Sequence, residues 1–304
     1  MELWILLPLV SSLLMASVNV VDKFFVLEGD DNLDYKSFCL YSGGMQILIF
    51  ALLFAFDPIN LFELLKSQSL IVILSGVFFG LSLIFLVKAM DIEEISRVEP
   101  IYLIHTILVP VIGLLFLSEN LSLVKYLGII FIFISSIFAS IRWDKNIKSI
   151  NKSAIYSLIL GGIFFAIASI LIKYSIDKKI FSDFQILSLR ALGLFFAAGI
   201  PFMNKINVSS LKIFFNHKKR GTALFVFETI FPLLSMYLIV ISLNHIEVSI
   251  VNSLNGSRPI FTIIFSLLLA YTLKQDTQEK LDKVNIFIKF TSGVLALIGI
   301  ILLA

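Results

Sequence analysis

The sequence has few of the residues that form redox sites, metal sites and nucleic-acid surfaces. Cys39 is the only cysteine, which excludes an intramolecular disulfide bond and a cysteine metal cluster. The three histidines lie in separate segments without the spacing of a zinc protease. Charged residues make up only 15% of the chain, and the net charge of +3 is scattered over loops instead of forming one basic face. We therefore expect no metal, no cofactor and no nucleic-acid partner.

Long apolar runs fill the sequence instead. Hydrophobic residues make up 59% of it and the mean hydropathy is +1.00, whereas soluble domains are about half apolar. Continuous runs of about 20 apolar residues, enough to cross roughly 30 Å of hydrocarbon, favour helices over the alternating strands of a membrane barrel. The chain begins "MEL" without a basic leader, so we interpret the first run as a retained helix. The sequence predicts an all-α membrane protein with ten transmembrane helices, near residues 3–27, 37–56, 70–90, 96–117, 121–141, 154–174, 184–203, 222–243, 246–273 and 285–304.

The two halves of the chain form an internal repeat. A shift of 150 residues aligns Lys23 with Lys173, and a shift of 153 residues aligns Glu99 with Asn252. Identities are few, but five apolar runs are followed by five more. An odd number of spans in each repeat gives the two halves opposite orientations, as in many transporters. We therefore expect two inverted five-helix repeats, at residues 1–142 and 154–304, joined by a loop at 143–153.

Single residues at particular places in the predicted helices form a further pattern. The first helix ends in a small-residue and asparagine stretch followed by lysine, and the third runs into an alanine. The fourth ends at a glutamate that opens a short turn, the seventh carries an early arginine, and the ninth has a mid-helix proline. These positions are Ala16, Asn19, Lys23, Ala89, Glu119, Gly128, Arg190 and Pro259. In this order, over nearly the whole chain, they resemble the EamA-type permeases of the drug/metabolite transporter superfamily, which have two five-helix repeats.

This resemblance implies a membrane transporter with both termini in the cytoplasm. The chain departs from the family pattern at Thr106, where the first repeat usually has proline, and at Thr272, where the second usually has its glutamate. The charge pattern implies the opposite orientation, because the loops after odd-numbered helices, including 204–221, carry most of the basic residues. By the positive-inside rule these loops are cytoplasmic and both termini lie outside. The two indications disagree.

Glu99 is a candidate site residue because ionisable residues inside membrane helices are usually functional. Burial near hydrocarbon favours its protonated form, so it could carry a proton or bind a cation. Alternatively, it forms a salt bridge with Arg97 or Lys88. Its repeat partner Asn252 is polar but cannot titrate, so the two halves would place an ionisable and a non-ionisable side chain on opposite sides of a central cavity.

The stretch "VNSLNGSRPIF" (251–261) is the richest polar segment inside an apolar run. Asn252, Ser253 and Asn255 offer hydrogen-bond donors and acceptors, and the proline after Arg258 frees a backbone carbonyl one turn earlier. Arg258 could bind a carboxylate or phosphate with two hydrogen bonds. Transporters build sites where such loosened helices line a wet cavity. Alternatively, these residues only hold neighbouring helices together.

Five further residues complete the set of candidate site residues. Glu228 lies a turn or two into the eighth helix and is either functional or paired near the interface. Tyr102 and Tyr237 could form an aromatic wall that holds an ammonium group by cation–π contact. Asn19 and His105 align with polar residues of the second repeat.

Two cations and two glycines have simpler interpretations. Lys173 and Arg190 lie near predicted helix ends, where long cationic side chains reach the interface or pair with carboxylates. We interpret both as anchors or salt-bridge partners. Gly76 and Gly80, four residues apart in the third run, predict a face on which a neighbouring helix packs closely.

These features predict a secondary transporter in the cytoplasmic (inner cell) membrane that moves a small polar organic metabolite by alternating access. Opposite charges from Glu99 and Arg258 would suit an amino-acid-like or other zwitterion, and Glu99 would allow proton coupling. We expect the protein to work in the lipid bilayer as a monomer or homodimer. One alternative is an intramembrane lipid-processing enzyme, for which the sequence offers no converging nucleophile, base or metal cluster. Another is a receptor or scaffold without transport.

Overall fold

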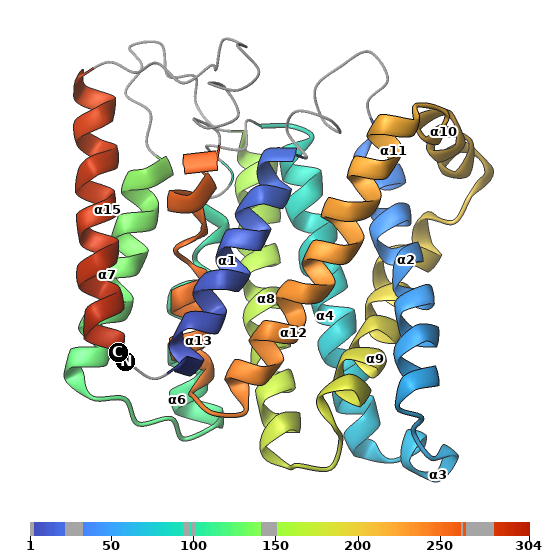
Figure 1. The fold of residues 1–304 in the computed structure, drawn as a ribbon, viewed down its shortest axis with the longest axis horizontal. Helices are drawn as coiled ribbons and strands as arrows, with labels where there is room; N and C mark the ends of the chain where they lie inside the picture. Colours follow the sequence, from blue (N-terminus) through green and yellow to red (C-terminus); the bar gives the residue numbers. More distant parts are fainter. Residues whose placement is uncertain are drawn as a thin grey trace.

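The computed structural model describes residues 3–21, 33–93, 98, 101–140, 151–262, 264–265 and 283–304, and every regular element within them is helical (Figure 1). The first half contains α1 (Leu3–Val21), α2 (Tyr35–Phe56), α3 (Leu61–Leu64), α4 (Ser67–Met90), α6 (His105–Phe116) and α7 (Leu123–Ser140). The second half contains α8 (Lys152–Asp177), α9 (Asp183–Leu194), α10 (Lys205–Asn216), α11 (Lys218–Phe225), α12 (Phe231–Leu243), α13 (Val248–Asn255) and α15 (Lys283–Leu303). The π turn η2 (Phe195–Gly199) and the 3₁₀ turn η3 (Ile200–Phe202) extend α9, and the π turn η4 (Val226–Ile230) joins α11 to α12.

Many of these helices have the length and composition of membrane spans. Six segments within the described residues are long and apolar enough to cross a bilayer: Trp4–Val21, Tyr35–Phe56, Ser67–Met90, Lys152–Asp177, Asp183–Phe202 and Arg220–Leu243. Three shorter apolar helices are His105–Phe116, Leu123–Ala139 and Phe287–Leu303. Large apolar side chains such as Phe116 and Ile301 stay exposed on the outside of the bundle, which suits a lipid environment. The prediction of an all-α membrane protein is confirmed for the described residues.

Polar residues at the ends of the apolar runs start the helices. Asn151 precedes α8, and its side chain accepts the backbone N–H of Ser153 at 2.9 Å. Ser182 precedes α9 and forms a reciprocal pair of hydrogen bonds with Gln185. Such caps satisfy backbone N–H groups that have no partner within the helix. The helices therefore begin where the polar segments meet the apolar runs.

The helices of the two halves interleave, and α1 and α8, the first long helix of each half, run in opposite directions. In Figure 1, α1 rises from the face that holds both termini, whereas α8 descends toward that face. Across the two halves, α1 packs against α12, α4 against α8, α2 against α9, and α7 against α15. The halves are therefore not two separate bodies, because most of the close helix pairs combine one helix from each.

Two helical segments are interrupted at matching places. A turn at 103–104 separates the helical residue Tyr102 from α6, and a turn at 256–257 separates α13 from the helical residues that follow. These turns stand 153 residues apart, which is the shift that aligns Glu99 with Asn252 in the sequence. The second turn lies against the start of α6, because a Cβ atom on Gly256 would lie 3.0 Å from Thr106 Oγ1. The first break forms although Thr106 occupies the usual place of a proline.

Glycines allow α4 and α9 to approach closely. A Cβ atom on Gly76 would lie 2.0 Å from the carbonyl oxygen of Arg190, and one on Gly193 would lie 2.0 Å from that of Ile73. A Cβ on Gly80 would lie 2.8 Å from the Cβ of Ala197, just beyond α9. Only residues without side chains fit at such distances, so the close-packing face predicted from Gly76 and Gly80 is confirmed. This contact holds the backbone of Arg190 directly against α4.

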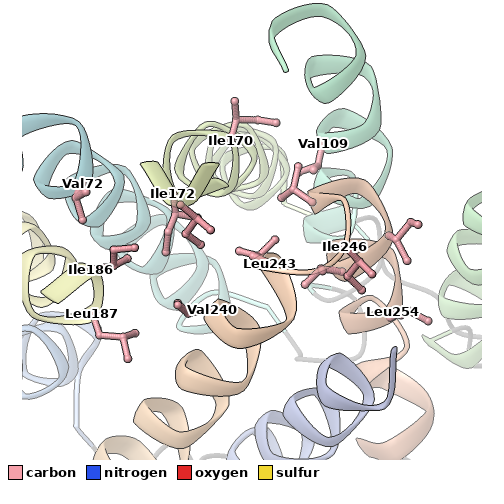
Figure 2. Close-up of a cluster of buried hydrophobic side chains, with 14 of the residues drawn as sticks. Val72, Val109, Ile170, Ile172, Ile186, Leu187, Val240, Leu243, Ile246 and Leu254 are labelled. Atoms are coloured by element: carbon pink, nitrogen blue, oxygen red, sulfur yellow. The ribbon is translucent and has the colours of Figure 1, made fainter. Parts of the chain in front are cut away.

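A cluster of buried aliphatic side chains joins the two halves. Figure 2 shows Val72 and Val109 of α4 and α6 together with Ile170, Leu243 and Leu254 of α8, α12 and α13. Lipid tails are as apolar as these side chains, so close packing contributes most of their mutual attraction. The cluster therefore fixes the helices of both halves relative to one another.

One helix lies where the sequence analysis predicted a loop. α10 occupies most of residues 204–221, and Asn204 caps it by accepting the N–H of Asn207 at 2.9 Å. The Asn207 amide donates to the carbonyl oxygen of Phe202 at 2.8 Å, and Phe214 is buried. Leu211 and Phe214 pack inward, whereas Ile206 and Ile213 are exposed beside Lys205 and Lys212. The basic residues still lie between two candidate spans, but Lys205 and Lys212 are on a short helix instead of in an irregular loop.

Candidate functional site

A cavity of about 170 Å³ lies between helices of both halves. Its wall comes from α1, α2, α4, α8, α9, α12 and α13, and from Tyr102 and Arg258 beside the two helix breaks. Most of the lining side chains are aliphatic or aromatic. The polar ones are Gln46, Tyr102, Ser169, Arg190, Ser235, Asn252, Asn255 and Arg258. A mainly apolar cavity with a few polar groups is typical of a site for a small organic molecule.

The polar face of α13 contributes two asparagines to this cavity. Residues three or four apart share one side of a helix, so Val248, Asn252 and Asn255 face the cavity together. Asn252 is buried, and its Nδ2 has no hydrogen-bond partner among the described residues. Ser253, next to Asn252 around the helix, does not line the cavity, and its hydroxyl donates to the carbonyl oxygen of Ser249 at 2.7 Å. Of the predicted hydrogen-bonding wall, the structure brings the two asparagines to the cavity but not the serine.

Serines from two other helices satisfy the carbonyl groups freed at the α13 break. The Ser12 hydroxyl of α1 donates to the carbonyl oxygen of Asn255 at 3.3 Å, four residues before the proline of this segment. The Ser136 hydroxyl of α7 donates to the carbonyl oxygen of Gly256. Interrupted backbone is tolerated at membrane depth when side chains replace the lost hydrogen bonds. The freed carbonyl predicted from the sequence is therefore present, and it is bonded.

A second, smaller cavity of about 30 Å³ adjoins the first. Asn19 and His105 line it, so the structure brings both of these candidates near the break. Tyr102, Asn255 and Arg258 line both cavities and therefore stand between them. A solute that moved from one cavity to the other would pass these three side chains.

Only one of the two candidate tyrosines belongs to an aromatic wall. The Tyr102 hydroxyl is hydrogen-bonded to the Ser82 hydroxyl at 2.8 Å, and its ring lies 6.0 Å from that of Phe165, which also lines the larger cavity. Tyr237 stacks on Phe184 instead, with ring centroids 5.5 Å apart, and does not line the cavity. The side of α12 that carries Tyr237 packs against α9.

Arg190 lines the cavity, although the sequence analysis interpreted it as a helix-end anchor or salt-bridge partner. It is only 6% exposed, and its guanidinium carbon lies 4.7 Å from the ring centroid of Phe79. The described residues include no carboxylate paired with it. The close contact at Gly76 brings it inward, which no local feature of the sequence reveals. The early arginine of the family pattern was the only signal for it.

The remaining charged candidates lie elsewhere. Glu228 is buried in η4, where its carboxylate accepts the Ser42 hydroxyl at 3.4 Å, and it does not line the cavity. Glu99 falls outside the described residues. Lys173 forms a salt bridge with Asp177 at 3.0 Å, so its interpretation as a salt-bridge partner is confirmed.

Comparisons with known proteins agree with this architecture. Residues 2–141 match the EamA-like transporter family. The fold matches 28 chains of solved structures. One of them is a crystal structure that shares 10% sequence identity with this chain. The two align with a TM-score of 0.69, over 98% of this chain and 96% of that chain. No curated protein matches. The likeness to the crystal structure concerns the fold alone. The family match agrees with the resemblance described above over residues 2–141, and the helices of membrane-spanning length indicate a multi-pass membrane protein.

Proposed function

We propose that the protein is a secondary transporter of the cytoplasmic membrane that moves a small polar organic metabolite by alternating access. The cavity between the two halves carries this proposal, because both halves supply its wall and relative movement of the halves would change its access. The family match and the apolar exterior support the same function.

We further propose ten transmembrane helices in two inverted repeats. The opposite directions of α1 and α8 support the inversion (Figure 1). The helix breaks at 103–104 and 256–257 support it independently, because they stand at the same repeat shift as the aligned sequence. Broken helices that meet near the bilayer centre are a common construction for transporter sites.

In the proposed site, Asn252 and Asn255 bind polar groups of the solute, and Arg258 binds an anionic group beside Tyr102. An amino-acid-like zwitterion would also need a carboxylate for its ammonium group. Glu99 is the residue proposed for that role and for proton coupling. A Glu99→Gln variant tests the coupling: proton-driven net uptake should stop while solute-for-solute exchange continues. Loss of both activities would indicate direct solute binding by Glu99.

Counterflow in proteoliposomes tests transport itself. Purified protein is first screened for thermal stabilisation by a metabolite library, because a ligand that binds the native state raises its melting temperature. The hits are then assayed as labelled solutes. Asn252→Leu should reduce counterflow roughly tenfold by removing a polar contact and filling space, whereas Ser253→Ala, on the same helix but off the cavity, should leave it unchanged. Binding without counterflow would favour a receptor, and chemical conversion of a hit would favour an enzyme.

A further inference from the structure

Arg190 combines a buried position, a charged head and a place in the cavity wall. It is 6% exposed and lines the cavity, and its Nε has no hydrogen-bond partner among the described residues. Its guanidinium carbon lies 4.7 Å from the Phe79 ring centroid. A cation–π contact of this kind compensates only part of the hydration that a buried guanidinium loses.

Among the described residues, the wall of the cavity provides Arg190 with no counter-ion. The described lining of the cavity contains two arginines, Arg190 and Arg258, and no carboxylate. A buried charge in membrane is normally paired or lies in a pathway for ions or substrates. An anion that entered the cavity would supply the missing partner.

The fold holds Arg190 inside the helix bundle, away from the end of α9. A Cβ atom on Gly76 would lie 2.0 Å from the carbonyl oxygen of Arg190, so the backbone of Arg190 packs directly against α4. It lies seven residues after Asp183, the first residue of α9, which corresponds to about 10 Å along a helix. The side chain turns toward the ring of Phe79 instead of extending to the helix end as a snorkelling arginine does.

Arg190 and Arg258 stand at different levels of the cavity. Phe79 marks the level of Arg190, and Leu86 lines both cavities together with Arg258. These two residues of α4 are seven positions apart, or about 10 Å along the helix. A small solute that carries one carboxylate would therefore contact Arg190 in the larger cavity after leaving the junction at Arg258.

We propose that Arg190 binds the carboxylate of a small organic anion whose apolar group lies against the aromatic and aliphatic wall of the cavity. This inference rests on the proposed function and narrows its substrate class from small polar organic metabolites to organic anions, in place of the zwitterion considered above. The wall beside Arg190 suits an apolar body, because Phe79, Phe165, Leu233 and Met236 line it. The planar guanidinium would bind the two carboxylate oxygens side by side.

Three probes with one carbon skeleton test the proposal: 4-methylpentanoate, its amino-acid counterpart leucine, and 3-methylbutylamine. Their binding to the full-length protein in detergent is measured by thermal shift and isothermal titration. We expect 4-methylpentanoate to bind most tightly and the amine not to bind. Tighter binding of leucine or of the amine would overturn the anion assignment, as would the absence of any shift with 4-methylpentanoate at its solubility limit.

Variants at Arg190 then test the residue itself. Arg190→Gln should weaken 4-methylpentanoate binding about ten- to a hundredfold, and Arg190→Lys less, because lysine keeps the charge but not the planar fork. Arg220→Gln, which removes an arginine outside the cavity, should bind as the unchanged protein does. Equal affinity in all three variants would show that Arg190 is structural. If Arg190→Gln does not fold, Arg190→Lys and Arg220→Gln are compared instead: weaker 4-methylpentanoate binding in Arg190→Lys alone supports the proposal, and equal binding contradicts it.

The same probes separate this inference from the proposed function. Carboxylate binding that depends on Arg190, combined with no counterflow of labelled 4-methylpentanoate in proteoliposomes, would support the anion site and contradict transport. Counterflow that Arg190→Gln leaves unchanged would support transport and contradict the anion site.

Discussion

The Glu119 carboxylate accepts the backbone N–H of Val248 at 2.8 Å, although 129 residues separate the two in the sequence. It also accepts the N–H of Ser249 at 3.3 Å and the hydroxyl of the same residue. Glu247, at the N-cap position of α13, makes no side-chain cap of its own. A glutamate of the first half thus caps a helix of the second half, at the end opposite its break.

Removing this cap should destabilise the protein. Glu119→Ala leaves buried N–H groups without partners, so we expect a loss of about 1–3 kcal/mol, and Glu119→Gln a smaller loss because its amide oxygen still accepts one bond. Thermal unfolding of the purified protein in detergent measures both. Glu63→Ala, a change in the short helix α3, should have little effect. An unchanged melting temperature in Glu119→Ala would contradict the role of the cap.

A pair of glycine substitutions tests the contact that positions Arg190. Gly76→Ala would press a methyl group into the Arg190 carbonyl, so we expect a destabilisation of about 1–3 kcal/mol from overpacking. Gly44→Ala is the matched control, because a Cβ on Gly44 of α2 would meet nothing within 4 Å. It should be neutral or slightly stabilising, since alanine favours a helix over glycine. Equal melting temperatures for the two variants would contradict the close approach of α4 and α9.

Cysteine labelling tests the topology and the conflict over orientation. Ser67 begins α4 beside α3, and Ser209 lies on α10 at the opposite end of the bundle (Figure 1). In a Cys39→Ser background, single cysteines at these two positions should react with an impermeant maleimide from opposite sides of the membrane. Labelling of both from one side would contradict the proposed arrangement. Labelling of position 209 from the cytoplasm would favour the charge rule over the orientation implied by the family.

Arg258 has a prediction of its own. Arg258→Lys keeps the charge but loses the planar fork, so a bound carboxylate or phosphate should bind about tenfold more weakly. Arg258→Ala should weaken it further. Isothermal titration with the hits of the library screen measures both. Normal binding in both variants would assign Arg258 a structural role and leave anion binding to Arg190.

The sequence predicted the helices better than it predicted the cavity. A membrane-spanning helix needs about 20 predominantly apolar residues, so it can be recognised in the sequence as a continuous run. Which side chains of a helix face the cavity depends on how the helix is rotated about its axis, which the sequence does not show. Asn252 and Ser253 are adjacent and both polar, but they are about 100° apart around the helix, and only the asparagine lines the cavity. The sequence analysis interpreted Arg190 as a helix-end residue, whereas it lines the cavity. Its position results from the close contact between α4 and α9, which glycines in both helices allow.

The serines at the α13 break have a consequence for movement. In an unbroken helix each carbonyl keeps its own N–H partner, and sliding a neighbouring helix leaves that bond untouched. Here the carbonyl oxygens of Asn255 and Gly256 depend on hydroxyls of α1 and α7. When either helix shifts, its hydroxyl moves away from the carbonyl oxygen, which then needs water or another donor. The neighbouring Ser257 hydroxyl, 3.3 Å from that of Ser12, already donates to the carbonyl oxygen of Leu254 at 2.7 Å. Movement of α1 or α7 against the break therefore requires these hydrogen bonds to be replaced, so the packing of the two halves is coupled to the backbone hydrogen bonds of this segment.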